Sequence, residues 1–79
     1  MKSHKCIKVV WRDATSIDGW ISSTDLDTSC DIIETVGLYV AENSKVLTVG
    51  LNWDSTIDHY SCIINIPKSW IIRRKWVKC

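Results

Sequence analysis

The chain has 79 residues and a formal net charge of +1, and its length limits it to one small domain covering residues 1–79. A domain of this size buries only about 60% of the surface of its unfolded chain, so we expect a homo-oligomer that buries more. No stretch approaches the roughly 20 apolar residues of a membrane span, which excludes a transmembrane helix and gives no reason to expect a membrane partner.

The amino-terminal residues MKSHKCIKVV contain no apolar run of signal-peptide length and no cleavage-site pattern. We therefore expect a cytoplasmic protein whose four cysteines are thiols. Cys30 and Cys62 are expected to be buried, whereas Cys6 and Cys79 are expected to be partly exposed.

The charges are segregated along the chain. All nine acids lie between Asp13 and Asp58, a region in which Lys45 is the only base. The other bases lie in residues 2–12 and 68–78. If these two ends pair in space, the molecule has one basic face and one acidic face.

The first predicted strand covers residues 6–14, in which Ile7, Val9 and Trp11 stand two positions apart. This period is typical of a strand that buries one face. The following segment, residues 15–20, is a turn by composition.

Residues 22–30 have room for one short helical turn with a serine cap but lack the length of a stable helix. The next segment, residues 34–54, consists of two β-branched runs joined at residues 42–45, which predicts a hairpin with a tight turn. Gly37 and Gly50 lie inside these runs, where glycine often marks a bulge or a sharp bend.

Residues 54–59 form a predicted loop, and residues 60–67 form a fourth strand. Pro67 ends that strand because proline has no N–H to donate to a ladder. After a corner at residues 68–69, residues 70–78 form a short fifth strand, which we expect to contact a neighbouring subunit.

Five short strands and almost no helix predict an all-β fold, namely a five-stranded, strongly bent antiparallel small barrel with at most one short helical turn. The sequence TVGLYVAENSKVLTVGL followed by INIPKSWIIR resembles the Sm-like or SH3-like small barrels, and especially a group of short phage-encoded proteins. The resemblance covers residues 6–77. It includes a tryptophan in the first strand, a second in the loop, a VG-led hairpin and an Ile-Pro-Lys corner before the last strand.

The resemblance implies a phage protein of the host cytoplasm, a homo-oligomer that sequesters a nucleotide-derived signal of host immunity without catalysis and without a cofactor. The alternative is an Sm-like adaptor whose basic face binds RNA or a host protein. The two functions differ in their response to salt, because a nucleic-acid binder releases many counterions and loses affinity steeply.

In such barrels the first and last strands are neighbours, which would join the two basic ends of the chain. Arginine forks suit phosphates and tryptophan faces suit nucleobases. The candidate ligand-binding residues are Trp11, Arg12, Trp70, Arg73, Arg74 and Trp76. In a second interpretation the tryptophans belong to the core or to a subunit interface, and the bases protect an edge strand.

No metal site is predicted, although His4 with Cys6 and His59 with Cys62 are candidate ligand pairs, because the paired spacing of zinc ligands is missing. No enzyme activity is predicted either. The chain has no glycine-rich phosphate loop, no GxSxG elbow and no HExxH motif.

Overall fold

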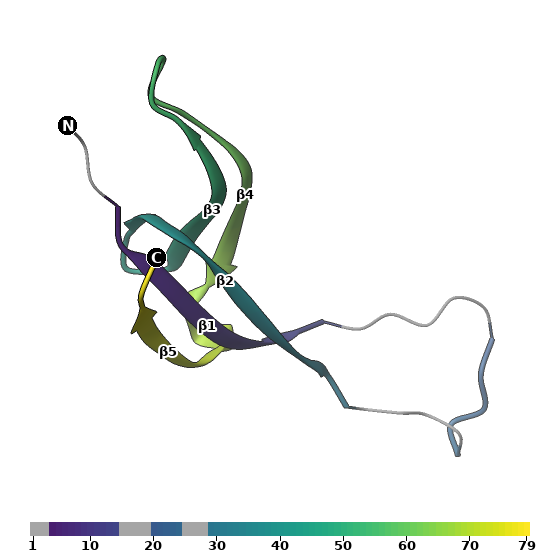
Figure 1. Ribbon diagram of the computed structural model, residues 1–79. Coiled ribbons are helices and arrows are strands. Elements are labelled where there is room, and N and C mark those ends of the chain that lie inside the picture. The colour runs from purple at the N-terminus through teal and green to yellow at the C-terminus, as the bar shows by residue number, and fades with distance from the viewer. Residues whose placement is uncertain (1–3, 15–19, 25–28) are drawn as a thin grey trace.

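The structure, a computed structural model, describes residues 4–14, 20–24 and 29–79. These residues contain β1 (Cys6–Asp13), β2 (Asp31–Glu42), β3 (Val46–Asp54), β4 (His59–Pro67), a 3-10 turn η1 (Lys68–Trp70) and β5 (Ile71–Val77). All neighbouring strands are antiparallel, in the order β4-β3-β2-β1-β5 (Figure 1). The predicted five-stranded antiparallel all-β fold with one short helical turn is confirmed.

The sheet curves strongly but does not close. β4 and β5 stand at the two ends of the strand order, and each pairs with a single neighbour among the strands that the structure describes. The molecule is therefore an open, barrel-like sheet with two edges rather than a closed barrel. No helix in the described ranges is long and apolar enough to cross a membrane.

The helical turn that the structure describes lies after β4, whereas the one predicted in residues 22–30 falls partly outside the described residues. Of that earlier segment, residues 25–28 lie outside the described residues, and the Thr24 N–H donates to Ser22 Oγ in a local turn. The predicted turn at residues 15–20 also falls outside the described residues, apart from Trp20.

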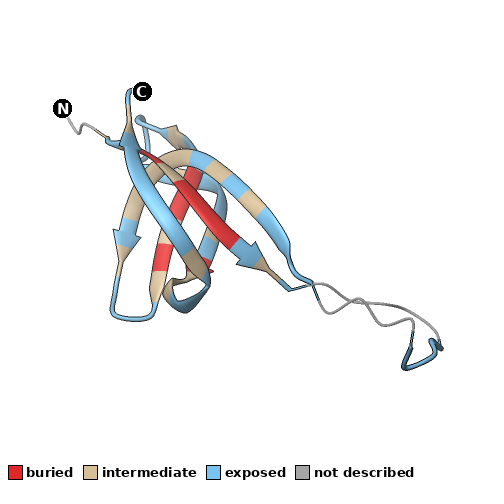
Figure 2. Ribbon diagram, turned by 90° about the horizontal axis from the view of Figure 1, so that it is seen from below, coloured by how far each residue is buried: buried red, intermediate tan, exposed pale blue. Residues whose placement is uncertain are grey.

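The core lies against β1, as its alternating pattern predicted. Ile7, Val9 and Trp11 are buried on one face, and the buried residues concentrate on this central strand in Figure 2. They form one cluster with side chains of β3 and β4, which are Leu47, Val49 and Ile66. β1 therefore carries much of the core. Because it pairs with both β2 and β5, it also positions the last strand.

The two predicted special glycines meet each other across β2 and β3. A Cβ atom on Gly37 would lie 2.7 Å from the Gly50 carbonyl oxygen and 2.8 Å from Val49 Cγ1, so a side chain there would force the strands apart. The register between β2 and β3 shifts close by, between Tyr39 and Ala41. This pair of features allows the sheet to bend sharply.

The turn between β2 and β3 contacts the corner after β4. Asn43 Oδ1 accepts hydrogen bonds of 2.8 Å from the N–H groups of Lys45 and Val46, which confirms the predicted tight turn. The Lys68 N–H in turn donates to the Lys45 carbonyl at 2.8 Å. The start of η1 is therefore fixed against the β2–β3 turn.

The expectation of four thiols is wrong, because Cys6 and Cys79 form a disulfide with a Cα–Cα distance of 5.3 Å. Cys6 pairs with Val77 across β1 and β5, so Cys79 follows just beyond its partner position. Sequence spacing gave no sign of this contact between the two ends of the chain. Cys30 and Cys62 are free thiols, and both are exposed rather than buried as expected.

Candidate ligand-binding site

The pairing of β1 with β5 joins the two basic ends of the chain. Lys8 is opposite Lys75, and Val10 is opposite Arg73. Paired residues share a face, and the Lys8 face, on which Val10 is also buried, is opposite the one that carries Ile7, Val9 and Trp11. We call this surface, formed by Lys8, Arg12, Arg73 and Lys75, the basic face.

The expected separation of acids from bases is incomplete. Glu34 of β2 lies 3.3 Å from Lys8 Nζ, because Val10, next to Lys8 on the same face, is opposite Glu34. Glu42, at the end of β2, pairs with Lys68 and Arg74. Two acids from the middle of the chain therefore neutralise part of the basic ends.

Trp70 and Arg12 border a hollow of about 390 Å³, which we call the Trp70 hollow. Trp70 ends η1, and its side chain is 41% exposed. Most of the lining is apolar, and it also includes one arginine and one aspartate. Its lining residues are Arg12, Asp13, Ala14, Cys30, Ser69, Trp70, Ile71 and Ile72.

The buried ring of Trp11 packs against the ring of Trp70. The two rings stack with centroids 6.4 Å apart and planes 15° from parallel. Trp11 is only 6% exposed, and its indole N–H donates to Thr35 Oγ1 at 3.0 Å, which fixes the ring in the core. Trp11 therefore holds Trp70 in place, while Trp70 presents the exposed aromatic surface.

A second hollow, of about 240 Å³, lies beside the first and is lined by Lys68, Ile71, Arg73 and Arg74. We call it the Arg73 hollow. Ile71 lines both hollows, so the two adjoin at the corner formed by η1 and the start of β5. Each contains at least one arginine from the predicted set.

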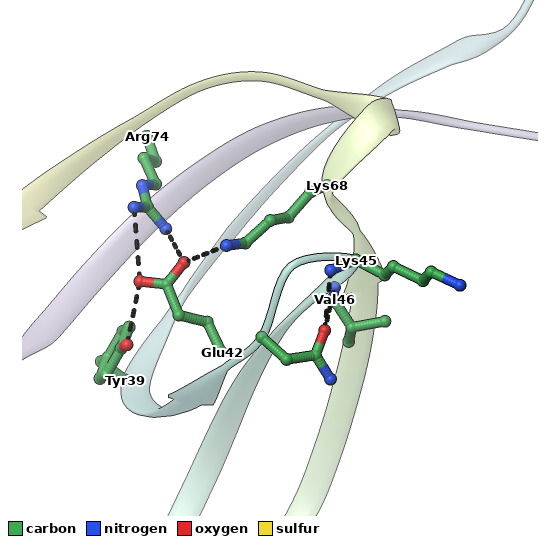
Figure 3. Close-up of polar contacts among 7 residues, drawn as sticks. Tyr39, Glu42, Lys45, Val46, Lys68 and Arg74 are labelled. Atoms are coloured by element: carbon green, nitrogen blue, oxygen red, sulfur yellow. Dashed lines mark hydrogen bonds and ion pairs between the residues drawn. The ribbon is translucent and has the colours of Figure 1, made fainter.

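Glu42 holds two of these cations. Its carboxylate lies 2.7 Å from Lys68 Nζ and accepts hydrogen bonds from Arg74 Nη1 at 3.0 Å and from the Tyr39 hydroxyl at 3.0 Å (Figure 3). Lys68, Arg74 and Tyr39 together lower the pKa of Glu42 to about 2. The Tyr39 pKa is raised, by burial first and then by its hydrogen bond to Glu42.

Trp76 lies near the other end of β5, apart from the Trp70 hollow. Its ring packs on Tyr39 with centroids 5.4 Å apart, and Lys5 Nζ lies 5.3 Å from its centroid. It lines a separate hollow beside the disulfide of Cys6 and Cys79. The six predicted residues thus divide into three groups, which are Trp11, Arg12 and Trp70; Arg73 and Arg74; and Trp76 alone.

Three side chains of this region were missed by the sequence reasoning, namely Tyr39, Glu42 and Lys68. Glu42 belongs to the acidic middle of the chain, and only the fold brings it to the last strand. The basic character of Lys68, next to the Ile-Pro corner, was a usable signal. Nothing in the spacing of the residues indicated the Glu42 contacts.

The candidate metal ligands have other contacts. His4 Nε2 hydrogen-bonds the Tyr60 hydroxyl at 2.8 Å, and its ring lies 4.3 Å from that of Trp53 in β3. Cys6 is in the disulfide. In the part of the chain that the structure describes, no three His, Cys, Asp or Glu side chains gather closely enough to hold a metal ion.

Comparisons with protein-family models, with curated proteins and with solved structures found no match for this chain.

Proposed function

We propose that the protein is a small phage-type binding module of the Sm-like or SH3-like kind, which sequesters a nucleotide-derived anion without altering it. One observation carries the proposal: an exposed tryptophan, Trp70, stacks on a fixed tryptophan, Trp11, beside Arg12 in a hollow of about 390 Å³. An aromatic face and an arginine fork are the two groups that recognise a base and a phosphate.

The size and chemistry of the hollow support this choice. Ligand sites commonly have volumes of about 300–1,000 Å³ and combine an apolar lining with a few polar groups. Here Trp70, Ile71 and Ile72 supply the apolar lining, and Arg12 supplies the charge. The carboxylate of Asp13 accepts the Ala14 N–H at 2.9 Å, so part of its hydrogen-bonding capacity is used locally.

In this function the protein is a homo-oligomer in the host cytoplasm. Two edge strands support the proposal of self-association, because each carries backbone groups that can pair with another chain. Sequestration works by stoichiometry, so abundant protein and tight binding suffice. Neither a cofactor nor a metal takes part in the proposed binding.

The first test is native mass spectrometry of protein purified from cells that make candidate immune nucleotides, followed by calorimetry with cyclic dinucleotides, cyclic trinucleotides and ADP-ribose derivatives. Replacing Trp70 by alanine should weaken binding by about tenfold or more, since stacking contributes roughly 1–3 kcal/mol per base. Trp76→Ala is the matched control, because that exposed ring borders a different hollow. Equal losses in the two variants would contradict the site.

The alternative function, an RNA- or host-protein-binding adaptor, is favoured by the basic face. Lys8, Arg12, Arg73 and Lys75 follow the two paired strands, and among the described residues only Lys8 of these four forms an ion pair with an acid. A steep fall of RNA affinity with salt, together with no heat from any small nucleotide, would replace the first proposal by this one.

A further inference from the structure

We propose that Glu42 occupies a phosphate subsite of this protein, and that the phosphoryl end of the ligand binds at the Arg73 hollow by displacing the Glu42 carboxylate. The base end of that ligand rests on the proposed function of the Trp70 hollow. The phosphate subsite itself is inferred from the contacts of Glu42, independently of the Trp70 hollow.

The groups around Glu42 are those that bind phosphate in proteins. Arg74 offers two N–H groups to the carboxylate, with Nη1 at 3.0 Å from Oε2 and Nη2 at 3.4 Å from Oε1. Lys68 adds a point charge at 2.7 Å, and Tyr39 adds a neutral O–H donor at 3.0 Å. A forked arginine with a lysine and a hydroxyl recognises a tetrahedral oxyanion as well as it recognises a carboxylate.

The charge balance favours a ligand with more negative charge than one carboxylate. Lys68, Arg73 and Arg74 line the hollow with three positive charges, whereas Glu42 supplies one negative charge. Arg73 is exposed and makes no ion pair with another described residue. When Glu42 leaves, a phosphate dianion offsets more of these three positive charges than the single carboxylate does.

Glu42 is also placed so that it can leave. It is the last residue of β2, immediately before the turn that begins at Asn43. Its side chain is 24% exposed and reaches the cations from the strand end, as Figure 3 shows. Rotation of one side chain into solvent is enough to free both Lys68 and Arg74, with no change in the backbone pairing.

The two hollows together define the class of ligand. Because Ile71 lines both, a base stacked on Trp70 and a phosphoryl group at Arg73 lie on adjacent sides of the same corner. A nucleotide with a terminal or bridging phosphate has both parts, whereas a nucleoside has only the base. Inorganic pyrophosphate has only the phosphoryl part and can test the subsite alone.

The experiment is calorimetric titration of pyrophosphate at low, fixed ionic strength into the wild type, Glu42→Gln and Glu34→Gln. Glu42→Gln removes the competing charge but keeps a carbonyl for the Tyr39 hydroxyl, so binding should tighten roughly fivefold, the size of one exposed ion pair. Glu34→Gln is matched in net charge and frees Lys8 instead. It should tighten pyrophosphate binding much less than Glu42→Gln does, because Lys8 is not among the residues that line the Arg73 hollow.

A third variant, Arg73→Gln, changes an exposed side chain outside the Glu42 contacts and should weaken pyrophosphate binding in the wild type and in Glu42→Gln alike. The proposal is overturned if Glu42→Gln binds no better than the wild type, or if Glu34→Gln gains as much. Pyrophosphate binding that survives Trp70→Ala, while no nucleotide binds the wild type, would keep the phosphate subsite and reject the proposed nucleotide function.

Discussion

The two edges of the open sheet have opposite character. β4, along His59–Pro67, contains no lysine, arginine, aspartate or glutamate, and its Ile63 is 49% exposed. β5, along Ile71–Val77, carries three bases, follows Trp70 directly and contains the exposed Trp76. Charged edge strands resist pairing with other chains, whereas uncharged ones invite it. For the proposed function, this difference favours ligand binding at the β5 side and self-association at the β4 side.

The largest expected effect comes from the disulfide that holds β5 to β1. Cys79→Ser opens a closure between residues 73 positions apart, and the chain-entropy relation puts the loss of unfolding free energy at about 4 kcal/mol. Urea denaturation of the two proteins measures the loss directly. Cys30→Ser, which removes an exposed free thiol, serves as the control and should change stability very little. Coincident unfolding curves for Cys79→Ser and the wild type would show that the disulfide does not stabilise the fold.

Substituting a lysine into each edge strand in turn tests which strand takes part in self-association. Ile63→Lys on β4 should weaken association by about tenfold or more, because it adds to β4 the charge that β5 already has. Ile72→Lys on β5 changes an isoleucine of similar exposure, at 43%, and should leave association unchanged. Sedimentation velocity over a range of concentrations measures both. Loss of association in Ile72→Lys alone would show that subunits contact each other through the fifth strand, as the sequence analysis predicted.

The sequence was most informative where one strand carries one pattern. The alternation of Ile7, Val9 and Trp11 predicted β1 and its buried face, and Pro67 predicted the end of β4. Side-chain period and backbone chemistry act locally, so they can be read from neighbouring residues. The strand count and the pairing of the two ends therefore agreed with the structure.

The contacts that cross the fold could not be predicted in the same way. Cys6 and Cys79 meet because two strands pair, and Glu42 reaches Arg74 because the β2–β3 turn lies against the corner after β4. The sequence also grouped Trp76 with Trp70, although they lie near opposite ends of β5. Composition shows which side chains are available, but only the register shows which of them meet.

Acid should lower the stability of the fold by protonating Glu42, which contacts Arg74 of β5. Lys68, Arg74 and Tyr39 lower its pKa from 4.5 to about 2, so the charged carboxylate stabilises the fold above pH 4.5. This contribution falls as the pH drops below 4.5 and is lost once the pH passes about 2. The difference in Tm between the wild type and Glu42→Gln should therefore shrink from pH 5 to pH 2. A difference that stays constant over this range would show that Glu42 is not held as a carboxylate.

The smallest effect concerns the support beneath Trp70. Thr35→Val leaves the Trp11 N–H without its 3.0 Å acceptor inside the core and should cost about 1 kcal/mol of unfolding free energy. Thr48→Val removes an exposed hydrogen bond to Asn65 on the β3–β4 side and should cost less. Thermal unfolding compares the two variants. A larger loss of unfolding free energy in Thr48→Val than in Thr35→Val would show that the Trp11 hydrogen bond does not stabilise the region beneath Trp70 more than the exposed bond stabilises the β3–β4 side.

The most direct test of the binding account follows the five tryptophan indole N–H signals by ¹H–¹⁵N NMR while a cyclic dinucleotide, a cyclic trinucleotide or ADP-ribose is added. Single substitutions assign each signal. For the ligand that binds, the account predicts saturable shifts of Trp70 and of Trp11, on which Trp70 stacks, with Trp53 unchanged. Saturable shifts confined to Trp76 or Trp20, or no shift with any of the three ligands, would contradict a nucleotide site at the Trp70 hollow.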